Sequence, residues 1–248
     1  MAHGRRVAVI TGASSGIGAA TVRRLHAEGF DVVAGARRVA RLREVTEPIG
    51  ATAIALDVRD RASVEAFAAQ VPRCDVLVNN AGGALGLEPL AQADEEQWRQ
   101  MWETNVLGLM LFTRALLPKL EASGNGHIVN IGSIAGFETY AGGAGYTSVK
   151  HGVRAISRTL RLELLGKPVR VTEIDPGLVE TEFSVVRFGG DADRAAKVYE
   201  GMTPLTGDDI ANCIAWAVTR PPHVNIDEMV VRPVAQATAT QVARNAGL

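Results

Sequence analysis

Residues Arg6–Gly18 read RVAVITGASSGIG, an apolar run that leads directly into a turn rich in glycine and serine. The run fits one buried strand, and the residues after Gly18 have the composition of a helix. Glycines at positions 12, 16 and 18 let the backbone turn sharply, approach a pyrophosphate closely and pack the helix against a sheet. The N-terminus of that helix offers free N–H groups and the positive end of its dipole to an anion. The segment therefore predicts a strand–turn–helix unit that binds the phosphates of a dinucleotide.

The spacing of this turn leaves one alternative to weigh. It reads G-x-x-x-G-x-G, which is neither the G-x-G-x-x-G of many dinucleotide enzymes nor a P-loop with its lysine. Gly12–Gly16 (GASSG) also fits G-x-S-x-G, the nucleophile turn of serine hydrolases, with Ser14 as the nucleophile. A hydrolase is disfavoured because the turn follows the first strand, which leaves no room for a preceding oxyanion loop. His151 and His223 also lack a supporting motif for the required base.

The alternation of strand and helix continues along the chain. Apolar runs predict strands at Arg6–Thr11, Asp31–Ala36, Thr52–Asp57, Cys74–Asn79, Gly126–Gly132, Pro168–Ile174 and Ile226–Arg232. Helices are predicted after Gly18 to about Glu28 and at Arg38–Pro48, Arg61–Gln70, Ala93–Leu120, Gly145–Leu165 and Asp208–Arg220, with Asp94 as an N-cap. This alternation predicts a Rossmann-type doubly wound parallel sheet of about seven strands with helices on both faces, an α/β fold. No linker or repeat divides it, so residues 1–248 are expected to form a single dinucleotide-binding and catalytic domain.

The composition excludes several classes of protein. Of 248 residues, 47% are hydrophobic, and 26 basic residues nearly balance 27 acidic ones. The balance argues against a nucleic-acid surface or a polybasic membrane patch. The first residues lack the apolar core of a signal peptide, and no apolar run approaches the ~18 residues of a membrane span. We therefore expect a soluble, cytoplasmic protein with a small-molecule substrate and no nucleic-acid or membrane partner.

Cysteine and histidine are few. Cys74 and Cys213 lie far apart in sequence, and we interpret both as buried thiols in a reducing compartment. The five histidines and two cysteines show none of the spacings of metal ligands, so no metal is expected.

The residues after the second predicted strand favour NADP over NAD. An NAD enzyme places an acidic residue about 20 positions beyond the glycines, where it binds the ribose hydroxyls. No acidic residue lies between Val32 and Arg43. Arg37 and Arg38 occupy this region instead, and guanidinium groups suit the 2′-phosphate of NADP.

Gly145–Val153 (GYTSVKHGV) carries a second chemical signal. Tyr146 and Lys150 are four residues apart, so on a helix they share one face. A phenol titrates near pH ~10, and a nearby ammonium group favours the phenolate and lowers that pKa toward the working range. The pair is therefore a candidate for proton transfer. The alternative is a chance pairing of a partly exposed tyrosine with a solvated lysine.

Taken together, the motifs resemble those of the short-chain dehydrogenase/reductase family, in its order and spacing and over essentially the whole chain. They are Thr11–Gly18 (TGASSGIG), Asp57-Val58, Asn79–Gly82 (NNAG), Asn105, Ser133, Tyr146-x-x-x-Lys150, and Pro176-Gly177 with Thr181.

The resemblance implies a catalytic set of Ser133, Tyr146, Lys150 and Asn105. Tyr146 would be the general acid and base, and Ser133 would hold the substrate oxygen. Lys150 would bind the nicotinamide ribose and lower the pKa of Tyr146. Asn105 would anchor a water in a proton relay to solvent.

The resemblance also implies a cofactor-binding set. Asp57 and Val58 would flank the adenine, and Pro176–Thr181 would close on the nicotinamide side. Ser133, Asn79 and Asp57 lie at the carboxyl ends of predicted strands, at the edge where open α/β sheets bind ligands. The full set is Gly12, Ser14, Ser15, Gly16, Ile17, Gly18, Arg37, Arg38, Asp57, Val58, Asn79, Ala81, Gly82, Tyr146, Lys150, Pro176, Gly177, Val179 and Thr181.

A closer resemblance is to the NADP-dependent 3-hydroxy acid dehydrogenases, which act on serine, allo-threonine and related acids. It rests on Gly142-Gly143, on Glu182–Asp191 (EFSVVRFGGD), on Pro222–Ile226 (PHVNI) and on Arg232–Val234 (RPV). The segment at about 180–204, which we call the flap, is expected to select the substrate, because loops over a rigid scaffold carry specificity. We expect Ser133, Tyr146 and Arg187 to contact substrate, with Arg187 binding a carboxylate. The alternative for Arg187 is an exposed side chain on a flexible flap.

Three other functions remain open from the sequence. A general NADPH-dependent aldehyde/ketone or oxoacyl reductase of the same family would share these motifs. A non-catalytic NADP sensor would have no need of an intact Ser–Tyr–Lys set, and the serine hydrolase is remote for the reasons above. The family resemblance also suggests a homotetramer, to which the apolar faces of Trp102–Leu120 and Tyr146–Leu165 would be suited.

Overall fold

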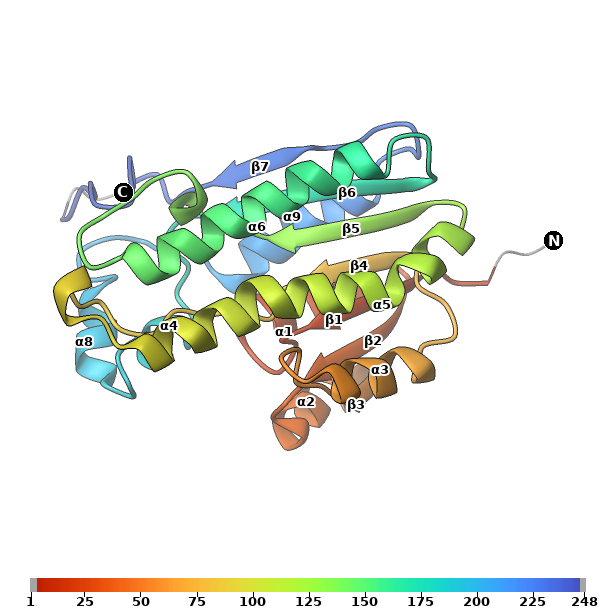
Figure 1. Ribbon diagram of the computed structural model, residues 1–248, viewed down its shortest axis with the longest axis horizontal. Helices are drawn as coiled ribbons and strands as arrows, with labels where there is room; N and C mark the ends of the chain where they lie inside the picture. Colours follow the sequence, from red (N-terminus) through yellow and green to blue (C-terminus); the bar gives the residue numbers. More distant parts are fainter. Residues whose placement is uncertain (1–3, 246–248) are drawn as a thin grey trace.

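A single seven-stranded parallel sheet forms the centre of the protein, whose computed structural model describes residues 4–245. The strand order is β3-β2-β1-β4-β5-β6-β7, and every neighbouring pair is parallel (Figure 1). The predicted doubly wound fold is therefore confirmed. The strands are β1 (Val7–Thr11), β2 (Asp31–Ala36), β3 (Thr52–Ala55), β4 (Val76–Asn79), β5 (Gly126–Ile131), β6 (Val169–Pro176) and β7 (Glu228–Val231).

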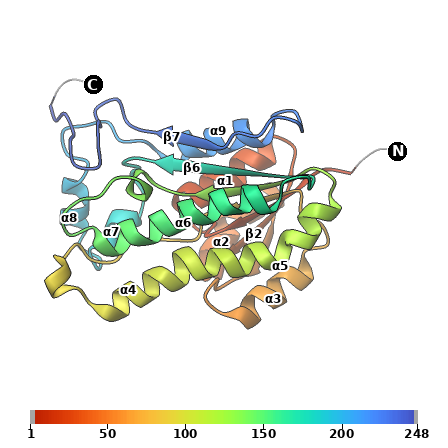
Figure 2. The same cartoon turned by 45° about the horizontal axis from the view of Figure 1, so that its top comes forward.

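Helices cover both faces of the sheet. The helices α3, α5 and α6 lie over one face, and α1, α2 and α9 lie behind it (Figures 1 and 2). The α-helices are α1 (Gly16–Ala27), α2 (Val39–Thr46), α3 (Arg61–Gln70), α4 (Glu95–Trp102), α5 (Gly108–Ala122), α6 (Ala144–Glu163), α7 (Phe183–Arg187), α8 (Ala192–Lys197) and α9 (Gly207–Val218). Shorter helical turns are η1 (Glu47–Ile49), η2 (Leu90–Gln92), η3 (Glu103–Leu107) and η4 (Ile134–Gly136).

The alternation of side chains along β1 explains why the sheet needs helices on both sides. Ala8 and Ile10 are buried in the cluster that contains α1 and α9, whereas Val9 is buried in the opposite cluster with α3 and α5. Phe67 of α3 meets Phe112 of α5 edge to face, with ring centroids 5.1 Å apart. Burial of each such large apolar side chain contributes about 1.5–3 kcal/mol to folding.

The long helical region predicted at Ala93–Leu120 is interrupted in the structure. Asp94 caps α4 as predicted, accepting hydrogen bonds from the N–H groups of Glu96 and Gln97. The helix then widens into one π-helical turn, η3, before α5 begins at Gly108. A π turn inserts an extra residue into the helical path and is frequent at functional sites. Hydrophobic periodicity does not reveal it.

The flap has more structure than the sequence indicates. It contains α7 and α8, and Asp191 caps α8 by accepting a hydrogen bond from the N–H of Arg194. Tyr199 fixes the flap from inside, because its buried hydroxyl donates to Val179 O and also meets Ser184 Oγ at 2.8 Å.

Two smaller expectations can be compared with the fold. Cys74 is buried as expected, but Cys213 is only half-buried because it lies on the partly exposed side of α9. Within residues 4–245, no helix combines the length and apolarity needed to cross a membrane.

Candidate active site

A cavity of about 720 Å³ opens at the carboxyl edge of the sheet. It is lined by the glycine-rich turn, the ends of β2 to β6, the start of α6, the flap and the segment after β7. Nearly all of the residues predicted from the sequence contribute to its wall. The exceptions are Gly18, Asn79 and Asn105.

The glycine-rich turn has the backbone that a close phosphate contact requires. Gly12 and Gly16 have φ of 66° and 53°, in the left-handed region that favours glycine. A Cβ atom on Gly12 would lie 2.9 Å from Cα of Ala81, and one on Gly18 would lie 2.3 Å from Gly12 O. Gly18 therefore packs the turn against α1 and does not itself line the cavity. Ser14 and Ser15 line the cavity at this turn.

Arg37 and Arg38 line the same end of the cavity, at the end of β2. The Nη2 group of Arg38 donates to Ser15 Oγ at 2.8 Å and reaches Ser14 Oγ at 3.4 Å. A guanidinium group is thus held beside the glycine-rich turn. The chain has no acidic residue between Val32 and Arg43, where an NAD enzyme carries its ribose-binding carboxylate, and the two arginines suit a 2′-phosphate.

The start of α6 brings the predicted acid/base pair together. Lys150 Nζ lies 5.8 Å from the centroid of the Tyr146 ring and donates to Ile131 O at 2.8 Å. The Tyr146 ring packs edge to face on Phe183 of α7, with centroids 5.4 Å apart. Both side chains line the cavity together with Ser133.

The pKa of Tyr146 is shifted in the direction opposite to the sequence-based expectation. Burial raises the pKa of the phenol, while its hydrogen bond with Ser133 and the charge of Arg187 lower it in part. Burial also lowers the pKa of Lys150 to about 8, against the influence of Glu173 and Asp175. Desolvation outweighs attraction here, so this arrangement holds Tyr146 as a protonated phenol.

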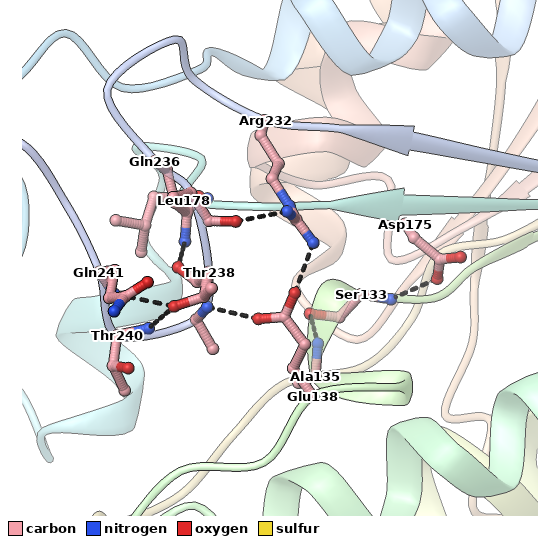
Figure 3. Close-up of polar contacts among 12 residues, drawn as sticks. Ser133, Ala135, Glu138, Asp175, Leu178, Arg232, Gln236, Thr238, Thr240 and Gln241 are labelled. Carbon is pink, nitrogen blue, oxygen red and sulfur yellow. Dashed lines mark hydrogen bonds and ion pairs between the residues drawn. The ribbon is translucent and has the colours of Figure 1, made fainter.

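Ser133 is fixed by its backbone as well as by its position after β5. Its N–H donates to the buried Oδ1 of Asp175 at 2.9 Å, and its Oγ accepts from the N–H of Ala135 at 3.1 Å (Figure 3). Burial raises the pKa of Asp175 to about 8, with nearby Glu173 and Glu228 adding to the effect. Buried groups therefore fix both the backbone and the hydroxyl of Ser133: Asp175 holds its N–H, and the N–H of Ala135 holds its Oγ.

Residues 6–188 match the family model for short chain dehydrogenases. The chain belongs to the short-chain dehydrogenase family. The predicted family and fold are thereby confirmed.

Relatives of this short-chain dehydrogenase include proteins with assigned reactions. The NADP-dependent 3-hydroxy acid dehydrogenase YdfG of Salmonella typhi is 46% identical, over 94% of this chain and 97% of the relative. An uncharacterized oxidoreductase of Mycobacterium tuberculosis is 61% identical, over 96% of this chain and 95% of the relative. A closed form of serine dehydrogenase complexed with NADP⁺ superposes with a TM-score of 0.92 at 44% identity, over 96% of this chain and 99% of that one. The predicted enzyme class and cofactor agree with these relatives.

Two asparagines of this short-chain dehydrogenase do not line the cavity, contrary to expectation. Asn79 Nδ2 is buried and donates to Thr113 Oγ1 and Asn130 Oδ1, both at 2.9 Å, so it joins β4 to its neighbours. Asn105 in η3 donates to Gly83 O and to Met101 O, and accepts from the N–H of Gly83. Its amide holds the loop after β4, and its role in a water relay stays a prediction.

Arg187 is half-buried and lines the cavity, so it is not a fully exposed side chain on the flap surface. Its Nε donates to Gly86 O at 3.0 Å and its Nη1 to the Tyr140 hydroxyl at 3.1 Å. The remaining Nη2 is buried and has no hydrogen-bond partner among the described residues. The guanidinium carbon lies 5.8 Å from the centroid of the Tyr146 ring. One charged group is therefore left without a hydrogen-bond partner beside Tyr146.

The segment of residues 232–241, which we call the tail segment, is a wall that sequence reasoning missed. Glu138, one turn beyond Ser133, binds Arg232 Nη2 and the N–H of Ala239, both at 2.5 Å (Figure 3). Gln236 accepts from the N–H of Leu178 at 2.8 Å. These contacts bring Gln236, Ala239 and Thr240 to the cavity. The only sequence signal was the resemblance at Arg232–Val234.

Proposed function

We propose that this chain is an NADP-dependent dehydrogenase that interconverts the hydroxyl and carbonyl groups of a 3-hydroxy acid such as serine or allo-threonine. The observation that carries the substrate class is the unsatisfied Nη2 of Arg187, buried beside Tyr146. The names of the relatives support the same class.

The chain's own residues would hold the cofactor along the carboxyl edge. The glycine-rich turn and the N-terminus of α1 suit the pyrophosphate, and Arg37 and Arg38 suit the 2′-phosphate. Asp57 and Val58 line the same cavity and would flank the adenine. Pro176, Gly177, Val179 and Thr181 line the cavity from the end of β6 onward and would close on the nicotinamide side. When bound, NADP supplies the hydride donor or acceptor.

Proton transfer belongs to Tyr146. In the reducing direction, its phenol gives a proton to the substrate oxygen, and Ser133 Oγ donates a hydrogen bond to the same atom. The raised pKa of Tyr146 keeps the proton in place until negative charge develops on that oxygen. In the oxidising direction the same residues act in reverse, so Tyr146 removes the hydroxyl proton.

Arg187 would bind the substrate carboxylate. A free guanidinium donor makes a charge-assisted hydrogen bond that is about twice as strong as a neutral one. The rest of the guanidinium is held by Gly86 O and the Tyr140 hydroxyl, so the free donor is oriented in advance. Arg187, Tyr146 and Ser133 line the same cavity, so an acid whose hydroxyl meets Tyr146 and Ser133 would direct its carboxylate toward Arg187.

The test is a substrate panel applied to Arg187→Ala. For 3-hydroxy acids with NADP⁺ we expect KM to rise about 10–100-fold, since a charged hydrogen bond contributes about 1.5–3 kcal/mol. For neutral alcohols, or methyl esters of the same acids, KM should change little. NADPH formation is followed by its absorbance.

The matched control is Arg194→Ala, which removes the same charge from α8 of the flap, where Arg194 stacks on Phe188. It should leave both substrate classes unaffected. Equal loss on acids and neutral substrates in Arg187→Ala would show that the residue only holds the flap, and would contradict a carboxylate-binding role.

A general aldehyde/ketone or oxoacyl reductase is the second candidate, because Leu87, Phe183, Val186 and Phe188 give the cavity an apolar side. Activity on aldehydes without any on hydroxy acids would select it. A serine hydrolase has little support, since Ser14 lies beside Arg38 while the His151 ring meets Thr147 O. A non-catalytic sensor would leave the Ser133–Tyr146–Lys150 arrangement without a purpose.

We also propose that the enzyme is cytoplasmic and homotetrameric. Free cysteines suit a reducing compartment. Apolar side chains of Trp102, Leu107 and Met110 are exposed along η3 and its flanking helices, where a second copy would cover them.

A further inference from the structure

One ion-pair cluster links the flap to the phosphate end of the cavity. Glu182, just before α7, meets Arg38 Nη1 at 2.9 Å with one carboxylate oxygen and Arg41 Nη1 at 2.5 Å with the other. Arg41 lies on α2, one turn beyond Arg38, and was not among the residues expected to bind the cofactor. One carboxylate thus engages two guanidinium groups.

The cluster lies on the glycine-rich turn itself. The other amino group of Arg38 donates to Ser15 Oγ, and a Cβ atom on Gly16 would lie 3.2 Å from Cβ of Thr181. The flap residue next to Glu182 therefore touches the turn. Both Glu182 and Arg38 line the cavity.

The carboxylate is ionised at neutral pH. Burial acts to raise the pKa of Glu182, but hydrogen bonds from Arg41 and Arg38 hold that pKa below its usual value. Its side chain makes no capping bond to α7. The charge of Glu182 is consequently directed at the two arginines and not at its own helix.

We infer that Glu182 competes internally with the 2′-phosphate of NADP, and that Arg41 is a further residue of the phosphate subsite. A carboxylate and a phosphate satisfy guanidinium donors in the same way, and two anions on the same two arginines repel each other. The 2′-phosphate must therefore displace or weaken the Glu182 contacts. This inference rests on the proposed use of NADP.

The competition has a consequence for cofactor choice and for the flap. NAD carries no 2′-phosphate, so it leaves Glu182 on the arginines and meets no competition. NADP releases Glu182, which adjoins the helix that carries Phe183 and Arg187. Occupation of the phosphate end is thereby coupled to the substrate end through α7.

The test measures dissociation constants of NADPH and NADH for the purified full chain by nicotinamide fluorescence. Exposed ion pairs each change an equilibrium by a factor of up to about five, so Glu182→Gln should tighten NADPH binding about threefold to tenfold. Its affinity for NADH should stay unchanged. Arg41→Gln should weaken NADPH binding by a similar factor, again without an effect on NADH.

Two matched variants control for charge alone. Glu180→Gln removes an exposed acid from the same flap, and Arg43→Gln removes an exposed arginine from the same helix α2 as Arg41. Both should leave the two dissociation constants near those of the wild type.

Weaker or unchanged NADPH binding in Glu182→Gln would overturn the competition, because Glu182 would then orient the arginines for the phosphate or play no part. Equal tightening of NADH would overturn its link to the 2′-phosphate. A wild-type chain that binds NADH as well as NADPH would instead contradict the proposed cofactor. The two failures are therefore distinguishable.

Discussion

At the scale of single residues, Tyr146 shows how burial and chemistry work together. Its pKa is raised because the cavity desolvates the phenolate, and the neighbouring Ser133 and Arg187 compensate only in part. At neutral pH, a phenol in this state is better suited to donate a proton to a developing alkoxide than to act as a base. The oxidising reaction should accordingly be favoured as pH rises, when removal of the phenolic proton becomes easier.

We predict that Tyr146→Phe lowers kcat by about 10²–10⁴, because the variant has no proton to transfer. Binding of NADPH, measured by fluorescence, should be largely intact. Tyr140→Phe is the comparison variant: it removes the hydroxyl that holds Arg187, so it should raise KM for acids while leaving proton transfer by Tyr146 in place. Retained turnover in Tyr146→Phe would remove the residue from the mechanism.

A second prediction at this scale concerns Asp175. Its folded-state pKa is raised to about 8, so its contribution to stability is present at low pH and is lost as pH rises toward 8. Asp175→Asn keeps an oxygen for the N–H of Ser133 and removes the charge. We expect the variant to gain stability relative to the wild type between pH 5 and pH 8, by roughly 1–3 kcal/mol.

Urea unfolding at the two pH values measures this difference. Asp57→Asn is the control, because the pKa of Asp57 is shifted in the opposite direction to that of Asp175. Hydrogen bonding from Arg59 lowers it. That variant should differ from the wild type by the same amount at pH 5 and pH 8. A pH-independent difference for Asp175→Asn as well would mean that its carboxyl is already charged in the folded protein.

At the scale of elements, the local motifs were predictable from the sequence. The parts of the cavity wall that distant segments contribute were not. The glycine-rich turn and the Tyr146/Lys150 pair are each encoded within a few residues, so their elements could be placed from the sequence. Tyr140, Glu138 and Thr240 carry no periodic or motif signal. Tyr140 and Thr240 line the cavity, and Tyr140 contacts Arg187 of the flap, whereas Glu138 holds the tail segment through Ala239.

The boundaries of elements show the same limit. The strand predicted at Thr52–Asp57 ends at Ala55, because β3 lies at the edge of the sheet and pairs only with β2. The strand predicted to end at Ile174 continues to Pro176, since pairing with β7 extends it. Neighbouring strands, which the local sequence does not contain, decide where each strand stops.

Glu138 provides a prediction for the tail segment. Glu138→Gln removes the charge that binds Arg232 and the N–H of Ala239. We expect KM for the substrate to rise about threefold to tenfold, since a charge-assisted hydrogen bond contributes about 1.5–3 kcal/mol and part of it is retained by glutamine. The dissociation constant of NADPH should not change, and proteolysis of the tail segment should become faster.

Glu163→Gln serves as the control for this variant, because Glu163 is exposed at the end of α6. An unchanged KM in Glu138→Gln would show that the tail segment keeps its place without this contact.

At the scale of the whole molecule, the sequence predicted the architecture, whereas the assembly stays a prediction. Seven apolar runs separated by helices allow essentially one type of sheet, and the observed strand order is that type. The number of subunits depends on surface side chains, whose exposure follows from packing. The sequence indicated the whole helical region Trp102–Leu120 as a candidate interface, and the folded chain shows that Trp102, Leu107 and Met110 are its exposed apolar side chains.

We predict a homotetramer in solution, to be measured by light scattering coupled to size-exclusion chromatography. Leu107→Glu places a charge in the exposed apolar surface and should reduce the assembly, because a buried unpaired charge is costly. Leu162→Glu, at an exposed leucine near the end of α6, tests whether that face also takes part. A monomeric wild-type chain would contradict the proposed assembly.

The tail segment also has a consequence for how the protein is made. Synthesis proceeds from the N-terminus at about 5–20 residues per second, so the glycine-rich turn leaves the ribosome long before residues 232–241. The contacts of Glu138 with Arg232 and Ala239, and of Leu178 with Gln236, can form only after the tail segment has been synthesised. These contacts complete the wall of the cavity. A nascent chain can therefore form the glycine-rich turn early, but it completes the wall of the cavity only after residues 232–241 have been synthesised.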